Sequence, residues 1–369
     1  MKDFRHLFFL PASLILIFIS CTKNEANPTD QSGNWVARAQ LTSFPRYGVA
    51  SFVIVDSAYI VGGYDGTIRY NDVWSYNVNT NAWSQKASMP VPATAPGGSG
   101  RAKGIGFTVL DKGYVATGEE LPTATNVFGR LKDTWEYTAT TNTWLQKANF
   151  PEPNDPSSGN PNGRIDAMGF TIGNLGYLTC GFNGTTQNDM WQFDPNAGAA
   201  GTWTQITPAG PLKKRRGGAV FVYNNEAYIV TGENNAVAVY DFYKFTPATA
   251  AWTPLRSIYN ISPDQYDDDY TDIGRSYGVG FVMNNGSTPK GYVTVGQING
   301  ANTMKTWEYD FATDLWTRKS PYESSRQSRT YATSFVVKGR AFVGLGTSIN
   351  LPLDNLDEWM PNQPYNSND

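Results

Sequence analysis

The feature that most constrains the fold is a residue pattern that recurs six times along the chain. Each unit opens with an arginine that precedes a short Gly-rich apolar segment. An aromatic residue follows 12 to 17 positions later, and a glycine lies four residues beyond it. The arginines are Arg46, Arg101, Arg164, Arg216, Arg275 and Arg329. The aromatic and glycine pairs are Tyr59/Gly63, Tyr114/Gly118, Tyr177/Gly181, Tyr228/Gly232, Tyr292/Gly296 and Phe342/Gly346. A period of 52 to 63 residues indicates one supersecondary unit that is repeated and packed against its neighbours.

The second half of each unit carries tryptophans at a fixed spacing. A large aromatic residue follows two positions after an aspartate in five units, and after Lys305 in the fifth. These pairs are Asp72/Trp74, Asp133/Trp135, Asp189/Trp191, Asp241/Tyr243, Lys305/Trp307 and Asp357/Trp359. A further tryptophan comes nine residues later at Trp83, Trp144, Trp252 and Trp316, and twelve later at Trp203. In the first unit we expect strands over 48–55, 58–61, 72–76 and 82–86, because turn residues separate these segments and no helical period is present. The sequence therefore predicts an all-β protein with four strands in each unit.

These marks in register resemble the kelch repeat family, and the resemblance covers residues 34–360. It implies a six-bladed β-propeller in which each unit is one four-stranded blade. The sequence departs from the family at the Gly-Gly doublet, which survives only as Gly62-Gly63. The first glycine is replaced elsewhere by Thr117, Cys180, Thr231, Val295 and Leu345.

The two ends of the repeat region indicate how the ring closes. The sixth unit stops after Trp359 and lacks a fourth strand, whereas residues 34–38 resemble the fourth strand at 142–146. We therefore expect the N-terminal strand to complete blade six, which would leave no unpaired sheet edge at the junction. Residues 361–369 are expected to form a C-terminal tail.

The N-terminal segment has the pattern of an export signal. Lys2 and Arg5 precede an apolar run over 7–19, and residues 18–21 read Phe-Ile-Ser-Cys, which resembles a bacterial lipobox. We expect residues 1–20 to be a lipoprotein signal peptide, Cys21 to carry the lipid and residues 21–33 to be a flexible tether. The expected location is a bacterial membrane, namely the outer membrane or the cell surface. Ordinary secretion with cleavage near Ser20 is the alternative.

The composition excludes several kinds of chemistry. The only histidine is His6, which lies in the expected signal peptide, so the mature chain has no imidazole for acid–base catalysis or metal binding. The copper site of the related galactose oxidases requires two histidines and a cysteine-linked tyrosine, and is rejected. Cys180 is expected to be a buried core residue. We expect no cofactor and no metal. The net charge of −3 does not favour nucleic acid.

Candidate binding residues fall into two sets. The six arginines could ring one mouth of the central channel and bind an anionic sugar, or each could pair with a recurring carboxylate such as Asp72. The residue after each glycine varies, which is more typical of a site than of a scaffold; these residues are Tyr64, Glu119, Phe182, Glu233, Gln297 and Thr347. Of these, we expect Tyr64, Glu119, Glu233 and Gln297 to contribute to binding. Long insertions at 88–100, 150–163 and 258–274 belong to the same expected face.

Three functions are compatible with these features. The first is a surface-anchored, monomeric binding module that recognises a glycan or a protein through the long-loop face and touches the membrane only through its lipid. The second is a sugar isomerase resembling the six-bladed sialic acid mutarotases, with Glu119 or Glu233 as acid–base groups. The third is an assembly role without a small ligand.

Overall fold

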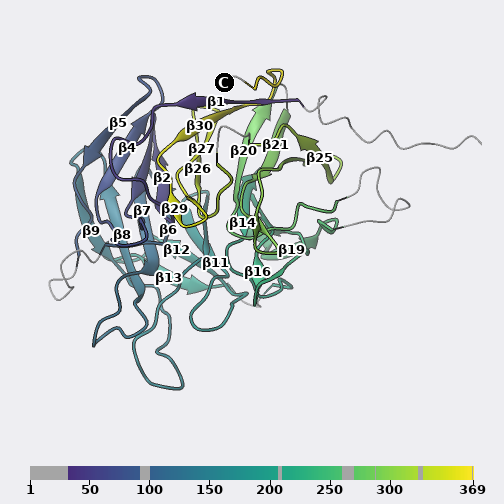
Figure 1. Cartoon of the computed structure of the whole chain (residues 1–369). Coiled ribbons are helices and arrows are strands. Elements are labelled where there is room, and N and C mark those ends of the chain that lie inside the picture. The colour runs from purple at the N-terminus through teal and green to yellow at the C-terminus, as the bar shows by residue number, and fades with distance from the viewer. Residues whose placement is uncertain are drawn as a thin grey trace, which may run out of the picture.

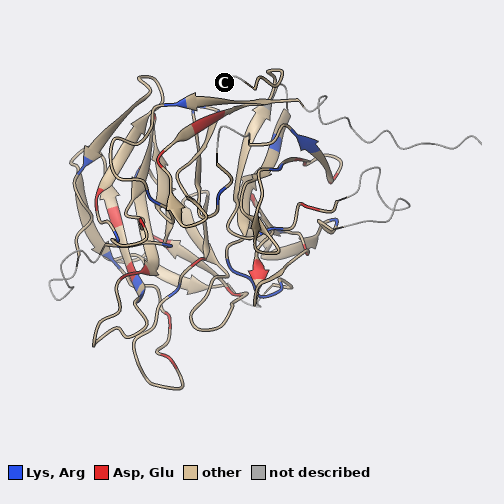
Figure 2. Ribbon diagram, viewed as in Figure 1, with Lys and Arg blue, Asp and Glu red and all other residues tan. Residues whose placement is uncertain are grey.

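The computed structural model describes residues 32–91, 100–206, 210–259, 270–286, 288–322, 327–367 and 369. The expected signal peptide, Cys21 and most of the tether lie outside this part of the chain. Six four-stranded antiparallel sheets are arranged in a ring (Figure 1). The prediction of an all-β six-bladed propeller is confirmed. Both signs of charge are spread over the blades (Figure 2).

The blades follow one another along the chain. Their strands, from the channel outward, are as follows: β2 (Ala50–Ile54), β3 (Ser57–Val61), β4 (Val73–Asn77) and β5 (Ala82–Lys86); β6 (Ile105–Val109), β7 (Lys112–Glu119), β8 (Arg130–Thr138) and β9 (Thr143–Lys147); β10 (Met168–Ile172), β11 (Leu175–Thr179), β12 (Met190–Asp194) and β13 (Thr202–Gln205); β14 (Ala219–Tyr223), β15 (Glu226–Val230), β18 (Tyr243–Thr246) and β19 (Ala251–Pro254); β20 (Val279–Asn285), β21 (Thr288–Thr294), β24 (Thr306–Asp310) and β25 (Leu315–Lys319); β26 (Thr333–Val337), β27 (Arg340–Gly344), β30 (Leu356–Met360) and β1 (Asn34–Arg38).

Blade six is closed by the N-terminal strand, as predicted. β1 pairs antiparallel with β30, and Trp35 lies opposite Trp359 in the register. Both indoles are buried, and Trp35 also meets Tyr322 edge to face. The C-terminal segment contacts the same strand, because Asn34 Nδ2 donates to Asp369 Oδ2 at 2.5 Å and Asn366 N donates to Asn34 Oδ1 at 3.2 Å. The two ends of the propeller are therefore joined by one continuous sheet (Figure 1).

The recurring aromatic residues form the core of each blade. The aromatic residue of the second strand lies opposite a phenylalanine of the first strand in all six blades. The two rings are stacked, with centroids 5.0–5.8 Å apart. The pairs are Phe52/Tyr59, Phe107/Tyr114, Phe170/Tyr177, Phe221/Tyr228, Phe281/Tyr292 and Phe335/Phe342. Such cross-strand aromatic pairs stabilise a sheet by roughly 0.2–1 kcal/mol each beyond the pairing of the backbone.

The glycine that ends this motif joins neighbouring blades. Its N–H donates to the carbonyl of the arginine that opens the next unit in five blades, and to that of Arg215, the residue before Arg216, in the third blade; the distances are 2.7–3.0 Å. Gly63 illustrates why a side chain is excluded here: its φ is +101°, and a Cβ would lie 2.7 Å from Val49 Cγ1. The preceding residue also has positive φ in every blade, including Thr117, Cys180 and Val295. The residues that replace the first glycine of the doublet therefore keep its backbone conformation, at a cost in strain.

The connections between the second and third strands of each blade, called hairpins below, lie on the same face of the propeller as the blade-to-blade loops. Each residue after the motif glycine forms a bridge with the residue after the opening arginine, except in the fourth blade, where Glu233 pairs with Arg216 itself. Three of the hairpins contain short strand pairs: β16 (Glu233–Asn234) with β17 (Val237–Ala238), β22 (Gln297–Ile298) with β23 (Ala301–Asn302), and β28 (Thr347–Ser348) with β29 (Leu351–Pro352). The loops at 120–129 and 150–163 project together from the ring (Figure 1). Among the described residues, no helix has the length and apolar character needed to cross a membrane.

Candidate functional site

The opening arginines do not line the channel mouth. Arg46, Arg101, Arg164, Arg275 and Arg329 are buried, with at most 3% of each exposed. Each donates from Nη1 to the carbonyl of the residue before the motif glycine, at 2.5–3.1 Å. The predicted arginine ring is therefore wrong, because these guanidinium groups point into their own blades. We call these residues and Arg215 the scaffold arginines.

Most scaffold arginines pair with the recurring blade carboxylate, as the alternative interpretation predicted. Arg164 is bound by Asp189 at 2.8 and 3.0 Å and by Glu152 at 2.6 Å. The same aspartate accepts a hydrogen bond from Trp191 Nε1 at 2.8 Å. One carboxylate thus fixes both the arginine and the tryptophan of a blade. In blade five, Arg275 is held by carbonyl groups instead, including that of Lys305 at 2.6 Å.

In the fourth blade the scaffold arginine is Arg215 and not the predicted Arg216. Arg215 is fully buried, donates to the Thr231 carbonyl at 3.0 Å and forms an ion pair with Asp241. The side chain of Arg216 is 30% exposed and pairs with Glu233 at 3.1 Å. The run of four basic residues at 213–216 offers two adjacent arginines, so the repeat spacing alone could not select between them.

A closed ring of backbone hydrogen bonds encircles the channel axis. The second residue after each scaffold arginine donates its N–H to the carbonyl of the equivalent residue in the preceding blade, at 2.7–3.3 Å. All six residues have φ between 53° and 64°. We call them the ring residues; they are Gly48, Lys103, Asp166, Gly217, Tyr277 and Tyr331. A left-handed backbone is uncommon in residues other than glycine. Lysine, aspartate and tyrosine at these positions therefore differ from the glycine that the backbone conformation favours.

The side chains of the ring residues meet those that follow the motif glycine. Glu119 binds Arg69 at 2.8 Å and Lys103 at 3.3 Å. Glu233 accepts hydrogen bonds from Ser276 Oγ at 3.0 Å and from Tyr277 Oη at 2.7 Å, in addition to its ion pair with Arg216. Two of the predicted site residues, Glu119 and Glu233, therefore join the ring. We call this group the mouth site: Arg69, Lys103, Glu119, Asp166, Arg216, Glu233, Tyr277 and Tyr331.

Aromatic rings complete the mouth site. Tyr277 and Tyr331 are stacked, with centroids 4.4 Å apart. Tyr47 meets Tyr64 edge to face at 5.4 Å, and also lies 6.0 Å from Tyr331. Burial is the main cause that raises the pKa of Tyr277 and of Tyr331, so both are neutral hydroxyl groups near pH 7. Tyr64 thus lies next to the mouth site; its expected part in binding stays a prediction.

Asp166 has the most unusual environment in this group. It is 8% exposed, and burial raises the pKa of its carboxyl to about 6. The positive charges of Lys103 and Arg216 act against this shift, and the negative charges of Glu119 and Glu233 add to it. A carboxyl that titrates near neutral pH is typical of functional sites.

Comparison with known proteins agrees with the repeats. A family model for the kelch motif matches residues 45–90, which span the first blade and its scaffold arginine. The protein is a six-bladed kelch propeller. No curated protein matches the chain.

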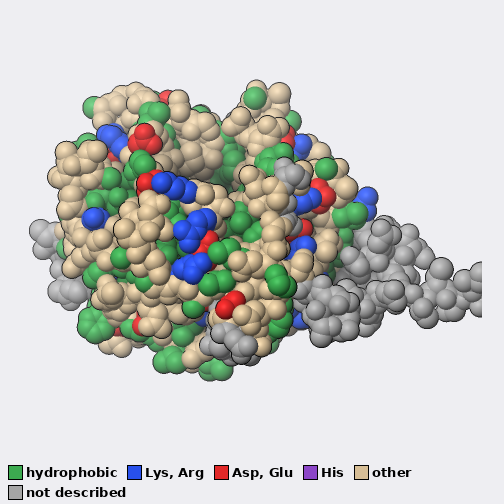
Figure 3. Space-filling model, turned by 90° about the horizontal axis from the view of Figure 1, so that it is seen from above, with side chains coloured by type: hydrophobic (Ala, Val, Ile, Leu, Met, Phe, Trp, Pro, Cys, Tyr) green, Lys and Arg blue, Asp and Glu red, His purple; other side chains and the backbone are tan. Residues whose placement is uncertain are grey.

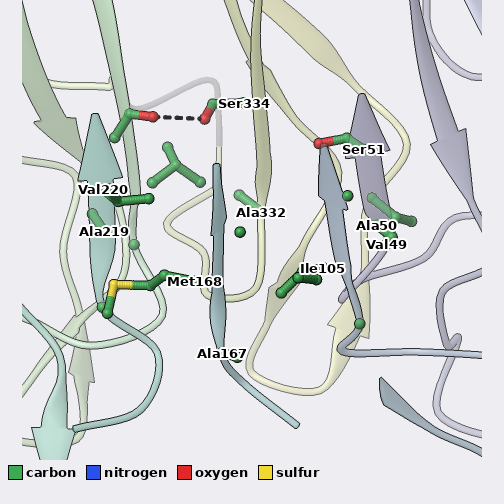
Figure 4. Close-up of a pocket in the computed structure, with 17 residues that line it drawn as sticks. Val49, Ala50, Ser51, Ile105, Ala167, Met168, Ala219, Val220, Ala332 and Ser334 are labelled. Carbon is green, nitrogen blue, oxygen red and sulfur yellow. Dashed lines mark hydrogen bonds between the residues drawn. The ribbon is translucent and has the colours of Figure 1, made fainter. Parts of the chain in front are cut away.

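Beneath the ring residues, the kelch propeller has a cavity of about 280 Å³ (Figure 4). The walls come from the first strands of all six blades and consist mainly of glycine, alanine, valine and serine; Met168 is the largest side chain. Ser334 Oγ donates to the Gly280 carbonyl at 3.1 Å, so the one donor of this hydroxyl is used. No charged side chain is among the residues that line this cavity, whereas the charged residues described above lie at the mouth.

Gln297 and Cys180 are not members of the mouth site defined above. Gln297 lies in the fifth hairpin, where its backbone pairs with Ser276. Cys180 is buried, and burial raises the pKa of its thiol to about 11, so it is a core residue. Within the described ranges no group of three or more His, Cys, Asp or Glu side chains could hold a metal ion. Asp264 and Asp267–Asp269, four acidic residues of the long insertion at 258–274, lie outside those ranges.

The ring residues were missed by sequence reasoning. Lys103, Asp166, Tyr277 and Tyr331 stand two positions after the arginine, where two blades have glycine. That variation was visible in the aligned repeats and is the signal that could have found them.

Proposed function

We propose that this kelch propeller is a binding module that recognises a glycan through its mouth site. Kelch propellers are common scaffolds for protein and ligand binding, and the divergence of the ring residues supports a binding site at this mouth. The main support is the variation among the six equivalent ring positions. Two of them hold glycine, whereas the other four hold one lysine, one aspartate and two tyrosines. A scaffold role would be served by the same small residue in every blade.

The chemistry of the mouth site suits a hydroxyl-rich ligand. Tyrosines supply apolar ring faces with polar edges, and the carboxylates and amines supply both acceptors and donors. On the face seen from above, several basic side chains lie near the middle of the surface, with fewer acidic side chains and with hydrophobic ones beside them (Figure 3). Tyr47 and Tyr64 are partly exposed, so they could contact a sugar. Mixed surfaces of this kind bind through few, well-placed polar contacts.

The hairpin tips could extend such a contact to a larger partner. Val237 is 67% exposed on the fourth hairpin, and Ile349 is 91% exposed on the sixth. A glycan displayed on a protein would reach both the mouth and these tips. A protein without a glycan is the competing ligand, and the test below separates the two.

The test is a binding screen of the protein against immobilised glycans, followed by calorimetry. We expect Lys103→Ala and Tyr331→Ala to weaken binding at least tenfold, and the matched far-face variant Lys338→Ala to leave it unchanged. Binding that survives the two mouth variants, or that persists after the glycan is removed from a bound glycoprotein, would contradict the proposal.

We further propose that the protein is exported and held on a bacterial membrane through Cys21. The support is the apolar run at 7–19 and the Phe-Ile-Ser-Cys segment that follows it. Incorporation of a labelled fatty acid should be lost in Cys21→Ala, and the variant should leave the membrane fraction. Equal labelling of both proteins would contradict a lipid anchor.

A second candidate is a sugar isomerase that interconverts anomers, as in the sialic acid mutarotases. Asp166 favours this reading, since a group with a pKa of about 6 can take up and release a proton near neutral pH. The burial of the scaffold arginines argues against an acidic substrate, because no free arginine ring is present to hold its carboxylate. NMR measurement of anomer exchange decides the matter: unchanged exchange rates with added protein would exclude the activity for the sugars tested.

A further inference from the structure

Asp166 differs from every other carboxylate of the mouth site in its hydrogen bonding. Glu119 is bound by Arg69 and Lys103, and Glu233 by Arg216, Ser276 and Tyr277. Among the described residues, no hydrogen-bond donor reaches the side chain of Asp166. A mostly buried carboxylate without a donor is costly, because it has lost much of its hydration and no hydrogen bond from the protein replaces it.

The backbone prevents Asp166 from relieving this cost. Its N–H donates to the Lys103 carbonyl at 3.3 Å, and its carbonyl accepts from Gly217 N at 3.0 Å. Both bonds belong to the closed ring, and the φ of 54° fixes the direction of Cβ. The side chain is thus held at the mouth, and its 8% exposure leaves it within reach of a small molecule.

The charged groups that face Asp166 are already engaged. Lys103 pairs with Glu119 and lies over the Tyr331 ring at 5.4 Å. Arg216 pairs with Glu233 and lies over the Phe182 ring at 5.0 Å. The remaining neighbours whose charge affects Asp166 are the two glutamates themselves, and Asp166 in turn acts on the hydroxyls of Tyr277 and Tyr331. Of the carboxylates in the mouth site, Asp166 therefore has the most unused capacity to accept hydrogen bonds.

We propose that Asp166 anchors a neutral sugar by accepting hydrogen bonds from two of its hydroxyl groups. This inference rests on the proposed function and names its ligand class. An ionised carboxylate has acceptor sites on both oxygens, so it matches a pair of neighbouring hydroxyls. The partly exposed Tyr47 and Tyr64 belong to the same aromatic group and could contact the apolar face of the sugar. A sugar acid would bring a second negative charge to a site whose cations are already paired, and is disfavoured.

The experiment measures binding of methyl glycosides of neutral hexoses and N-acetylhexosamines by calorimetry at pH 8. N-acetylneuraminic acid and glucuronic acid serve as the acidic comparison. The variants are Asp166→Asn, which keeps the shape of the side chain, and Asp111→Asn as the matched control. Asp111 also has a left-handed backbone, with φ 57°, and is exposed on the opposite face, so asparagine is tolerated equally at both positions.

We expect a neutral glycoside to bind, Asp166→Asn to weaken it at least tenfold and Asp111→Asn to have no effect. The affinity of the unmodified protein should rise between pH 5 and pH 7, because the ionised carboxylate is the better acceptor, whereas that of Asp166→Asn should stay level. Unchanged affinity in Asp166→Asn, or preferential binding of the sugar acids, would overturn the anchor while leaving a glycan-binding mouth intact. If no sugar of either kind binds, the anchor and the proposed function both fail.

Discussion

Trp35 of the first strand and Trp359 of the last strand lie side by side, with ring centroids 4.8 Å apart. This contact joins residues that are separated by almost the whole repeat region, and it fastens the ring. We expect Trp35→Ala to destabilise the protein by about 3–5 kcal/mol, because the cavity left by a fully buried indole cannot collapse. Urea unfolding followed by fluorescence measures this.

The control for this prediction is Leu145→Ala on β9, another outermost strand, where the side chain is 57% exposed. It should change the unfolding free energy by less than about 0.5 kcal/mol. Removal of residues 34–44 should prevent stable folding altogether. A cooperative, soluble domain without these residues would show that the ring does not depend on its closing strand.

The two adjacent arginines of the fourth blade should behave differently. Arg215→Ala leaves Asp241 and the Thr231 carbonyl without their buried partner, and should cost about 3–5 kcal/mol in the free energy of unfolding. Arg216→Ala removes a partly exposed side chain, while Ser276 and Tyr277 still bind Glu233, so the cost should be about 1 kcal/mol. Denaturant titration of both variants tests the assignment, and the reverse order would restore the register expected from the sequence.

Asp166 should reduce stability at neutral pH. Its pKa is raised in the folded protein, so the folded state binds the proton more tightly than the unfolded chain. Stability is then lost as the pH rises from about 4 through about 6, by roughly 3 kcal/mol at most. Asp166→Asn should therefore unfold at a higher urea concentration than the unmodified protein at pH 8 and at nearly the same concentration at pH 4.

The Asp111→Asn variant should show no such difference at either pH, because its carboxylate is solvated in both states. A lower stability of Asp166→Asn at pH 8 would mean that the carboxylate is held by favourable contacts. A residue that binds ligand at the expense of stability fits a functional role.

Cys180 should be unreactive in the folded protein. Its thiol is buried against Thr179, and its pKa of about 11 leaves little thiolate at pH 8. Reaction with a thiol reagent should be slow under native conditions and rapid in denaturant. Rapid native labelling would show that this blade opens readily.

The fold could be predicted from the sequence because its determinants recur. The stacked pair of Phe52 and Tyr59 and the closing pair of Trp35 and Trp359 follow from aromatic residues at fixed spacings, and burial dictates their direction. The observed strands of the first blade begin and end within two residues of the expected ones.

The site could be predicted only in part. Glu119 and Glu233 were found because their position varies from blade to blade. The sequence left two directions open for Arg46, because an arginine that starts an inner strand can point either to the channel or into its blade; the structure has the second, with an ion pair to Asp72. Asp166 was missed because its left-handed backbone and the closed ring depend on all six blades at once.

The most direct test of a sugar-binding mouth is a crystal structure of the propeller with the neutral glycoside that binds best. We predict that the sugar lies above the ring residues, with two hydroxyl oxygens within about 3 Å of the Asp166 carboxylate. A sugar bound on the opposite face, or one at the mouth that makes no contact with Asp166, would contradict the account.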